Sequence, residues 1–527
     1  MKSINKILLL ILFAAGMAGC KKSFLDRPSE SQISSNNFYK TKEDVRLATA
    51  SLYGGAPWGA WNYSTYLQLG DILSGNLYYS WFGDYIQLST RTITAQNSVL
   101  QTGWSGLYNV IAQCNTTLSG IDQYASASIA PADKNAAIGE AKFIRATAYY
   151  KLAINWGAVP IIEDNTTLIN DPLLKRNILI DVYKFIAKDL TYAAENLPAA
   201  DVAGRVTTWS AQGMLGKVYL TMAGLGQSAG TRNQAFLDSA IKYAGNVCKK
   251  SGLSLLSNYA NLFKPQFNDN PEALFSLQWA PGVGWNLGNQ LQHYSPSNDI
   301  MPQKTGAWTP LAPTWGLYQL YSGKDTIRRK ATFMLPGDFY PELNSAAGGY
   351  TANGATMKKH IVGNEKDNTS PTMDQNSSVE HNALLRLADV YLVYAEAILG
   401  NNGTTSDNNA LTYFNAVRSR AGVDPVTAIS MDDMLKERRI EFALEGQYWS
   451  DLVRLSYYNP QKAVDMLNSQ QNITFSYAAG VGTPTPAGSA GGPIAIVPAT
   501  ISNFTLQLPA SDVASDPSLA EPPVPYY

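Results

Sequence analysis

Apolar residues recur every three or four positions through much of the stretch from residue 103 to residue 250. One stripe runs through 141–152, a second through 182–197 with Pro198 behind it, and a third through 211–222. This spacing predicts amphipathic helices, and a second apolar edge at Phe143, Tyr150 and Ile154 predicts helices covered on more than one side. The spacing between the stripes is close to the 34-residue period of tetratricopeptide helix pairs, but it is not regular.

Helix-start signals flank this stretch on both sides. Thr41 with Asp44 and Ser430 with Asp433 have the spacing of capping boxes. Helices are predicted again from about Ala383, with one over Asn408–Ala421 that ends at Gly422. Both halves of the chain are therefore expected to be mainly α.

Two stretches lack a steady period. Residues 56–102 carry many aromatic residues among Gly, Asn and Ser, and residues 251–380 contain several prolines and four tryptophans around a short apolar run, Leu274–Trp279. We expect the first to be loop-rich and the second to be an ordered subdomain with short β-strands, because so many large rings argue against disorder. The predicted fold is mainly α: a tetratricopeptide-like scaffold of helical pairs with an irregular, loop-rich subdomain.

The N-terminus has the pattern of a secretory signal. Lys2 and Lys6 precede an apolar run, Ile7–Ala18, which is too short to span a bilayer comfortably. Cleavage after Gly19 would leave Cys20 first, which resembles a bacterial lipoprotein signal whose cysteine is acylated. An ordinary cleaved signal and an uncleaved anchor are the alternatives.

Composition argues against several classes of function. The 527 residues include 40 basic and 41 acidic side chains, a net charge of −1, which does not favour nucleic-acid binding. His293, His360 and His381 are widely separated, so we predict no metal and no cofactor. Cys114 and Cys248 are either a disulfide or buried small hydrophobic residues. No second apolar run of about 18 residues follows the signal, which predicts a soluble body.

An ordered set of motifs resembles the SusD/RagB family of outer-membrane nutrient-binding lipoproteins. The set consists of Cys20 with Ser23–Asp26, Ala141–Pro160, Asp189-Leu190, Gly204–Leu220, Arg386–Ala397, Asn415–Gly422 and Glu437–Arg454. The resemblance implies a lipid-anchored protein of the outer membrane that faces the cell exterior and has no enzymatic activity. It also implies a partner, a SusC-like TonB-dependent barrel that receives an oligosaccharide.

The resemblance and the composition together suggest a division of the chain. We expect a signal peptide at 1–19, a tether at 20–40, an N-terminal helical region at 41–250, the irregular ligand or partner subdomain at 251–380 and a C-terminal helical region with its tail at 381–527.

Sugar rings offer C–H faces to flat aromatic groups and hydroxyls to amides and carboxylates. Both kinds of partner occur at 76–85 and 279–315. The predicted platforms are Trp81, Tyr85, Trp285 and Trp308, with Asn76, Asp84 and Asn286 as polar partners.

Two alternative functions remain open. The same scaffold could capture another nutrient such as peptide. A secreted glycoside hydrolase would need two carboxylates across the scissile bond, and Asp71, Asp84, Asp299, Asp338 and Glu342 lie in the aromatic-rich stretches. Glu437, Glu441 and Glu445 beside Arg438 and Arg439 are interpreted as structural charge pairs on a helix.

Overall fold

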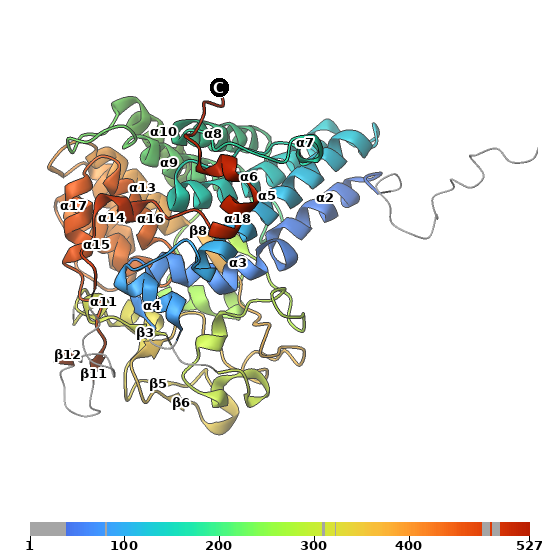
Figure 1. Cartoon of the computed structure of the whole chain (residues 1–527). Helices are drawn as coiled ribbons and strands as arrows, with labels where there is room; N and C mark the ends of the chain where they lie inside the picture. The colour runs from blue at the N-terminus through green and yellow to red at the C-terminus, as the bar shows by residue number, and fades with distance from the viewer. Residues whose placement is uncertain (1–37, 80–81, 308–310, 322, 477–484, 487–495) are drawn as a thin grey trace, which may run out of the picture.

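The computed structural model describes residues 38–79, 82–307, 311–321, 323–476, 485–486 and 496–527 (Figure 1). Its helices are α2 Lys42–Ala50, α3 Gly55–Leu67, α4 Gly83–Thr90, α5 Ser98–Tyr124, α6 Pro131–Trp156, α7 Thr167–Asn170, α8 Leu179–Asn196, α9 Thr208–Met222, α10 Gln234–Lys250, α11 Trp315–Tyr318, α12 Thr326–Thr332, α13 Leu387–Leu399, α14 Asn408–Arg420, α15 Met431–Glu441, α16 Tyr448–Ser456, α17 Pro460–Asn468 and α18 Ala510–Ser515. The predicted signal peptide, Cys20 and nearly all of the tether lie outside the described residues.

The long helices form a stacked scaffold. Helix α5 packs on α6, α6 on α8, α8 on α9, α9 on α10, α10 on α13 and α13 on α14. The predicted mainly α fold of helical pairs is therefore confirmed. Both capping boxes are present, with the Thr41 hydroxyl accepting from the backbone N–H of Asp44 and the Ser430 hydroxyl from that of Asp433.

A buried ion pair ties three of the scaffold helices together. Arg145 on α6 donates to both carboxylate oxygens of Asp189 on α8, at 2.8 and 3.0 Å, and to Asn115 on α5 at 2.8 Å. The two charged groups are almost fully buried. The bidentate geometry fixes how the helices face one another.

The strands are short and antiparallel. They are β1 Leu77–Tyr78, β2 Ala273–Leu277, β3 Ala312–Pro313, β4 Phe333–Met334, β5 Phe339–Tyr340, β6 Tyr350–Thr351, β7 Thr356–Met357, β8 Asn382–Arg386, β9 Thr404–Thr405, β10 Ile429–Ser430, β11 Phe475–Ser476 and β12 Thr485–Pro486. They pair as β1 with β3, β2 with β8, β4 with β7, β5 with β6, β9 with β10 and β11 with β12.

The strand predicted over Leu274–Trp279 is present in part, as β2 over Ala273–Leu277. The helix predicted from about Ala383 begins instead at Leu387, because residues 382–386 pair with β2 as strand β8. A strand partner more than a hundred residues away along the chain overrides the local pattern.

Residues 56–102 are more helical than expected. They include α3, a five-residue π-helix over Gln68–Ile72, α4 and the start of α5. Nine of the 13 residues of α3 are buried, so its apolar residues surround the helix and show no single stripe. The π-helix lies against the C-terminal half, where a Cβ at Gly70 would meet Gly446 Cα at 2.2 Å.

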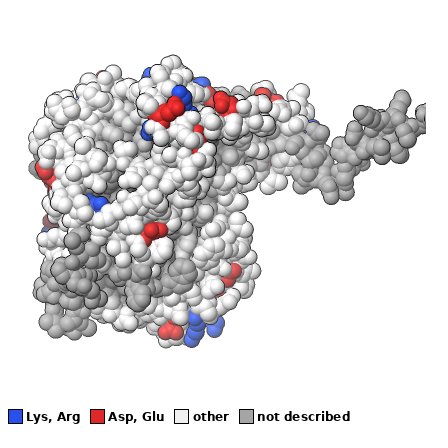
Figure 2. Space-filling view, in the orientation of Figure 1, with Lys and Arg blue, Asp and Glu red and all other residues white. Residues whose placement is uncertain are grey.

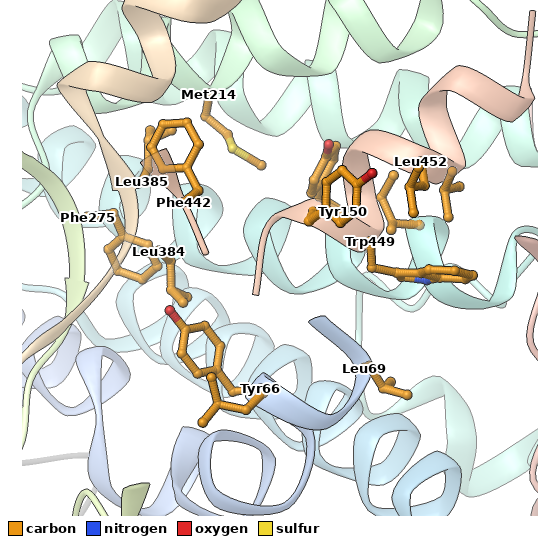
Figure 3. Packing of buried hydrophobic residues seen from close by; sticks show 14 of the residues in the cluster. Tyr66, Leu69, Tyr150, Met214, Phe275, Leu384, Leu385, Phe442, Trp449 and Leu452 are labelled. Carbon is orange, nitrogen blue, oxygen red and sulfur yellow. The ribbon is translucent and has the colours of Figure 1, made fainter. Parts of the chain in front are cut away.

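The main hydrophobic core joins the two halves of the chain. Figure 3 shows Phe275 from β2, Leu384 and Leu385 from β8, Tyr66 from α3 and Trp449 from α16 within one packed cluster. Its members come from 41–250, 251–380 and 381–527, so these three predicted regions share one main core.

The structural role predicted for Glu437, Glu441 and Glu445 is confirmed, but their charged partners are not those expected. Glu437 pairs with Arg328 and Arg418, and Glu445 lies beyond the end of α15 and pairs with Lys359 and Arg386. Arg438 instead pairs with Asp389 and Asp451. The expected pairing along one helix is thus replaced by bridges between elements.

Cys114 and Cys248 are free thiols, Cys114 buried and Cys248 half-buried, so the disulfide alternative is not formed. Within the described ranges, no helix combines the length and apolar character needed to cross a membrane, and no cluster of His, Cys, Asp or Glu is arranged to hold a metal ion.

Candidate functional site

An open cleft of about 290 Å³ lies where α3, α4 and the start of α5 meet the segment 285–294. We call it the aromatic cleft. It is lined by Tyr63, Ser64, Tyr79, Phe82, Tyr85, Ser98, Val99, Thr102, Trp285 and Tyr294.

Two rings of the cleft are widely exposed. Trp285 and Phe82 are each 47% exposed, far more than a core aromatic residue. Trp285 meets Tyr63 edge to face, with centroids 5.3 Å apart, and Phe82 meets Tyr85 in the same way at 5.1 Å. Each exposed ring is therefore held by a buried tyrosine behind it.

The back of the cleft is a hydrogen-bonded cluster of tyrosines. The Tyr85 and Tyr294 hydroxyls are 3.0 Å apart, and Gln68 Nε2 donates to both, at 3.0 and 2.7 Å respectively. Burial raises the pKa of both phenols, so they remain protonated. Tyr63 stacks on Tyr294 at 6.0 Å.

The loop that carries Trp285 is pressed against α3. The backbone N–H of Asn286 donates to Gln290 Oε1 at 3.1 Å, and Asn286 adopts a left-handed φ of 59°. A Cβ at Gly59 on α3 would lie 1.7 Å from the Asn286 carbonyl oxygen. Only glycine allows this approach, which places the indole at the rim of the cleft.

The cleft wall is uncharged among the described residues. Its polar side chains are hydroxyls, those of Ser64, Ser98 and Thr102 together with the tyrosines. The face that carries α3 and α4 is also largely free of charged side chains in Figure 2. Such a wall suits a neutral ligand with apolar faces and many hydroxyl groups.

The structure brings together some of the predicted site residues. Tyr85 and Trp285 line the aromatic cleft. Asp84 stands beside it, and its carboxylate accepts from the backbone N–H of Ser98 at 3.0 Å and from the Ser98 hydroxyl. Trp81 and Trp308 lie outside the described residues, as does Cys20.

The assignment of Asn76 as a ligand partner is corrected. Its side chain is fully buried, donates to Asp71 Oδ1 at 2.9 Å and accepts from Arg439 Nε at 2.8 Å. Asn286 is half-buried and its side chain does not line the cleft. The Asn76 amide serves the fold, because neighbouring elements cover it.

The other candidate carboxylates do not line the aromatic cleft. Asp71 is buried and accepts from the backbone N–H groups of Leu444 and Gly446, both at 2.8 Å. Asp338 pairs with Arg329, and Asp299 lies 4.0 Å from Lys304. The described wall of the cleft therefore does not hold the two facing carboxylates that a glycosidase uses.

Sequence reasoning missed Phe82, Tyr63, Tyr79 and Tyr294. Phe82 adjoins the predicted Trp81, and the two tyrosines at 63 and 79 belong to the aromatic-rich stretch 56–102. High aromatic density was thus a signal, but it did not separate exposed rings from buried ones.

Comparison with known proteins decides the family. A model described as the SusD family matches residues 271–482, and one described as starch-binding associating with outer membrane matches residues 23–220. A SusD-like protein of Bacteroides ovatus is 36% identical over 540 residues, covering 99% of this chain and 98% of the relative. The chain belongs to the SusD family.

Solved structures agree with this assignment to the SusD family. Two crystal structures are 35% identical, with TM-scores of 0.88 and 0.85. They cover 93% and 92% of this chain and 99% of each neighbour, and the second is of a protein with xylogluco-oligosaccharide. The SusD fold thus extends over nearly the whole chain.

Proposed function

We propose that this SusD-family protein binds a neutral oligosaccharide in the aromatic cleft and delivers it to a SusC-like TonB-dependent outer-membrane transporter. The observation that carries the proposal is the uncharged cleft with two exposed rings, Trp285 and Phe82. Xylogluco-oligosaccharide, found with a 35% identical neighbour, is the first ligand to test.

The chemistry of the cleft fits a sugar chain. The faces of Trp285 and Phe82 offer apolar contact to sugar C–H groups, and the hydroxyls of Ser64, Ser98 and Thr102 offer hydrogen bonds to the ring edge. A volume of about 290 Å³ is near the lower end of the range of about 300–1,000 Å³ for ligand sites. The cleft would hold a short segment of a longer chain.

Replacing Trp285 by alanine is expected to weaken binding of xylogluco-oligosaccharide roughly ten- to hundredfold, since the platform is lost. Isothermal titration calorimetry on the mature chain measures the change. Phe267→Ala, which removes a 37% exposed ring outside the cleft, is the matched control. Equal affinity of Trp285→Ala and Phe267→Ala would place the sugar elsewhere.

The alternatives give different results in the same assay. If peptides bind and no oligosaccharide gives a binding signal, a peptide receptor would be favoured. New reducing ends in a polysaccharide, lost on removal of one carboxylate, would favour a hydrolase. We favour binding without hydrolysis because the described wall of the aromatic cleft is uncharged.

The proposal includes a lipid anchor at Cys20 that holds the protein at the outer membrane, facing the cell exterior. Several acyl chains on one cysteine give stable attachment, because each buried CH₂ contributes about 0.8 kcal/mol. Affinity capture of the full chain from solubilised membranes, followed by a search for a large barrel protein, tests the transporter step.

Cys20→Ala is expected to move the protein from the membrane fraction to the soluble fraction, as measured by fractionation and immunoblotting. Cys248→Ser removes a half-buried thiol of the body and is expected to remain with the membrane. Retention of Cys20→Ala at the membrane would contradict anchoring through this residue.

A further inference from the structure

A second cleft, of about 330 Å³, lies between α12, strand β5 and the segment around residues 260–264. We call it the lysine cleft. It shares no lining residue with the aromatic cleft, and β5 lies at the lower edge of the molecule in Figure 1. The side chains that matter for its chemistry are Lys264, Ile327, Lys330, Phe339, Glu342 and Lys358.

Three lysines converge on this cleft. Lys330 Nζ and Lys358 Nζ lie 5.4 and 5.5 Å from the centroid of the Tyr340 ring. Burial lowers the pKa of Lys358, and the charge of Lys264 lowers it further, against the attraction of Glu342 and Glu380. The positive charge of Lys264 therefore repels that of Lys358, and a bound anion would relieve this repulsion.

The positive charge is only partly balanced. Lys358 Nζ donates to the Ile361 carbonyl oxygen at 3.0 Å and lies 3.7 Å from Glu342 Oε1. Lys264 and Lys330 form no ion pair within the described part of the chain. Glu342 on the described wall of the cleft is engaged by Lys358, so Lys264 and Lys330 are left without a carboxylate partner there.

An apolar platform stands beside these charges. Phe339 is 45% exposed and Ile327 is 42% exposed. The Phe339 ring rests against Gly349, where a Cβ would lie 2.6 Å from two ring carbons and where φ is 103°. A side chain at position 349 would displace the ring, so the glycine holds the platform at the cleft.

We propose that the lysine cleft is a second saccharide site, selective for an acidic sugar whose carboxylate lies among Lys264, Lys330 and Lys358 while its ring packs on Phe339. An ammonium group binds a carboxylate through charge-assisted hydrogen bonds. An exposed ring provides the contact that a sugar face needs. The inference is independent of the neutral ligand proposed for the aromatic cleft.

The test is calorimetric titration of the mature chain with digalacturonate and, as its neutral counterpart, a galactose disaccharide. Digalacturonate is expected to bind at least fivefold more tightly than the neutral disaccharide. Its affinity should fall several-fold between 20 and 300 mM NaCl, because salt screens exposed charges. Equal affinity for the two sugars would overturn the proposal.

Variants locate the site. The double variant Lys264→Gln/Lys330→Gln and the single variant Phe339→Ala are each expected to weaken digalacturonate binding at least fivefold. Lys304→Gln/Lys324→Gln makes the same change in net charge at exposed lysines outside the cleft and should have no effect. An equal loss in this control would indicate non-specific attraction and overturn the site.

The two sites are distinguished by crossing ligands and variants. Trp285→Ala should leave digalacturonate binding unchanged, and Phe339→Ala should leave xylogluco-oligosaccharide binding unchanged. Loss of digalacturonate binding in Trp285→Ala would assign the acidic sugar to the aromatic cleft and overturn the proposal. If digalacturonate bound as expected but xylogluco-oligosaccharide did not bind, the result would count only against the function proposed for the aromatic cleft.

Discussion

Glu396→Ala is expected to lower the free energy of unfolding by about 3–5 kcal/mol, because it leaves the buried guanidinium group of Arg232 without its carboxylate and that of Arg454 with Asp451 alone. Glu396 on α13 is fully buried. It accepts from Arg454 Nη1 and Nη2 at 2.5 and 2.6 Å and from Arg232 Nη1 at 2.9 Å. The three residues join α13, α16 and the segment before α10.

The lowered pKa of Glu396 predicts that the protein loses stability in acid. Burial alone would raise the pKa of Glu396, but the guanidinium groups of Arg454 and Arg232 outweigh it and lower the pKa from 4.5 to about 2. The carboxylate therefore stabilises the fold fully above its unfolded pKa and loses this contribution as pH falls from about 5 to 2. Denaturant titrations should show that the free energy of unfolding of Glu396→Gln falls less over this pH window than that of the unchanged protein.

An exposed ion pair provides the matched control for Glu396→Ala. Lys324 and Asp424 lie 2.6 Å apart with about two-thirds or more of each side chain exposed, so Asp424→Asn should produce no measurable change. If Glu396→Ala were no more destabilising than Asp424→Asn, the buried ion network would not contribute as described.

Lys151→Met is expected to raise the free energy of unfolding by roughly 2–4 kcal/mol at pH 7, by removing a buried amine that no described carboxylate pairs with directly. Lys151 on α6 is 7% exposed and lines a cavity of about 20 Å³ with Trp61, Leu69 and Trp449. It has no ion pair within the described ranges, and its Nζ is 6.0 Å from the centroid of the Trp61 ring. Figure 3 shows Trp449 and Leu69 in this part of the core.

The gain in stability of Lys151→Met should depend on pH. Burial and the nearby charge of Lys217 lower the pKa of Lys151 from 10.5 to about 7, against the attraction of Asp389, Asp71 and Asp451. The unfolded chain therefore binds more protons between about pH 7 and pH 10.5, and the stability of the unchanged protein rises with pH across this window. The advantage of Lys151→Met should shrink accordingly by pH 10.

Denaturant titrations at pH 7 and pH 10 measure this difference. Lys188→Met removes an exposed lysine from α8 and should show no such dependence. A Lys151→Met variant that is less stable than the unchanged protein at pH 7, or equally favoured at both pH values, would show that the amine is stabilised in the fold.

The sequence predicted part of the cleft. Tyr85 and Trp285 were named from aromatic density, and both line it. Asn76 was named for the same reason, yet it lies in the core between Asp71 and Arg439. Composition along a stretch shows that rings and amides are present, but exposure depends on what other segments cover them.

The sequence by itself determined the helical scaffold and its start signals. Apolar spacing in α6, α8 and α9 and the capping boxes at Thr41 and Ser430 are local properties, set by contacts within a few residues. The tertiary structure alone decided the strand at 382–386, the helix at 55–67 and the partners of Arg386, which are Glu272, Glu441 and Glu445. Those outcomes depend on segments distant along the chain, whose arrangement cannot be read from the residues beside them.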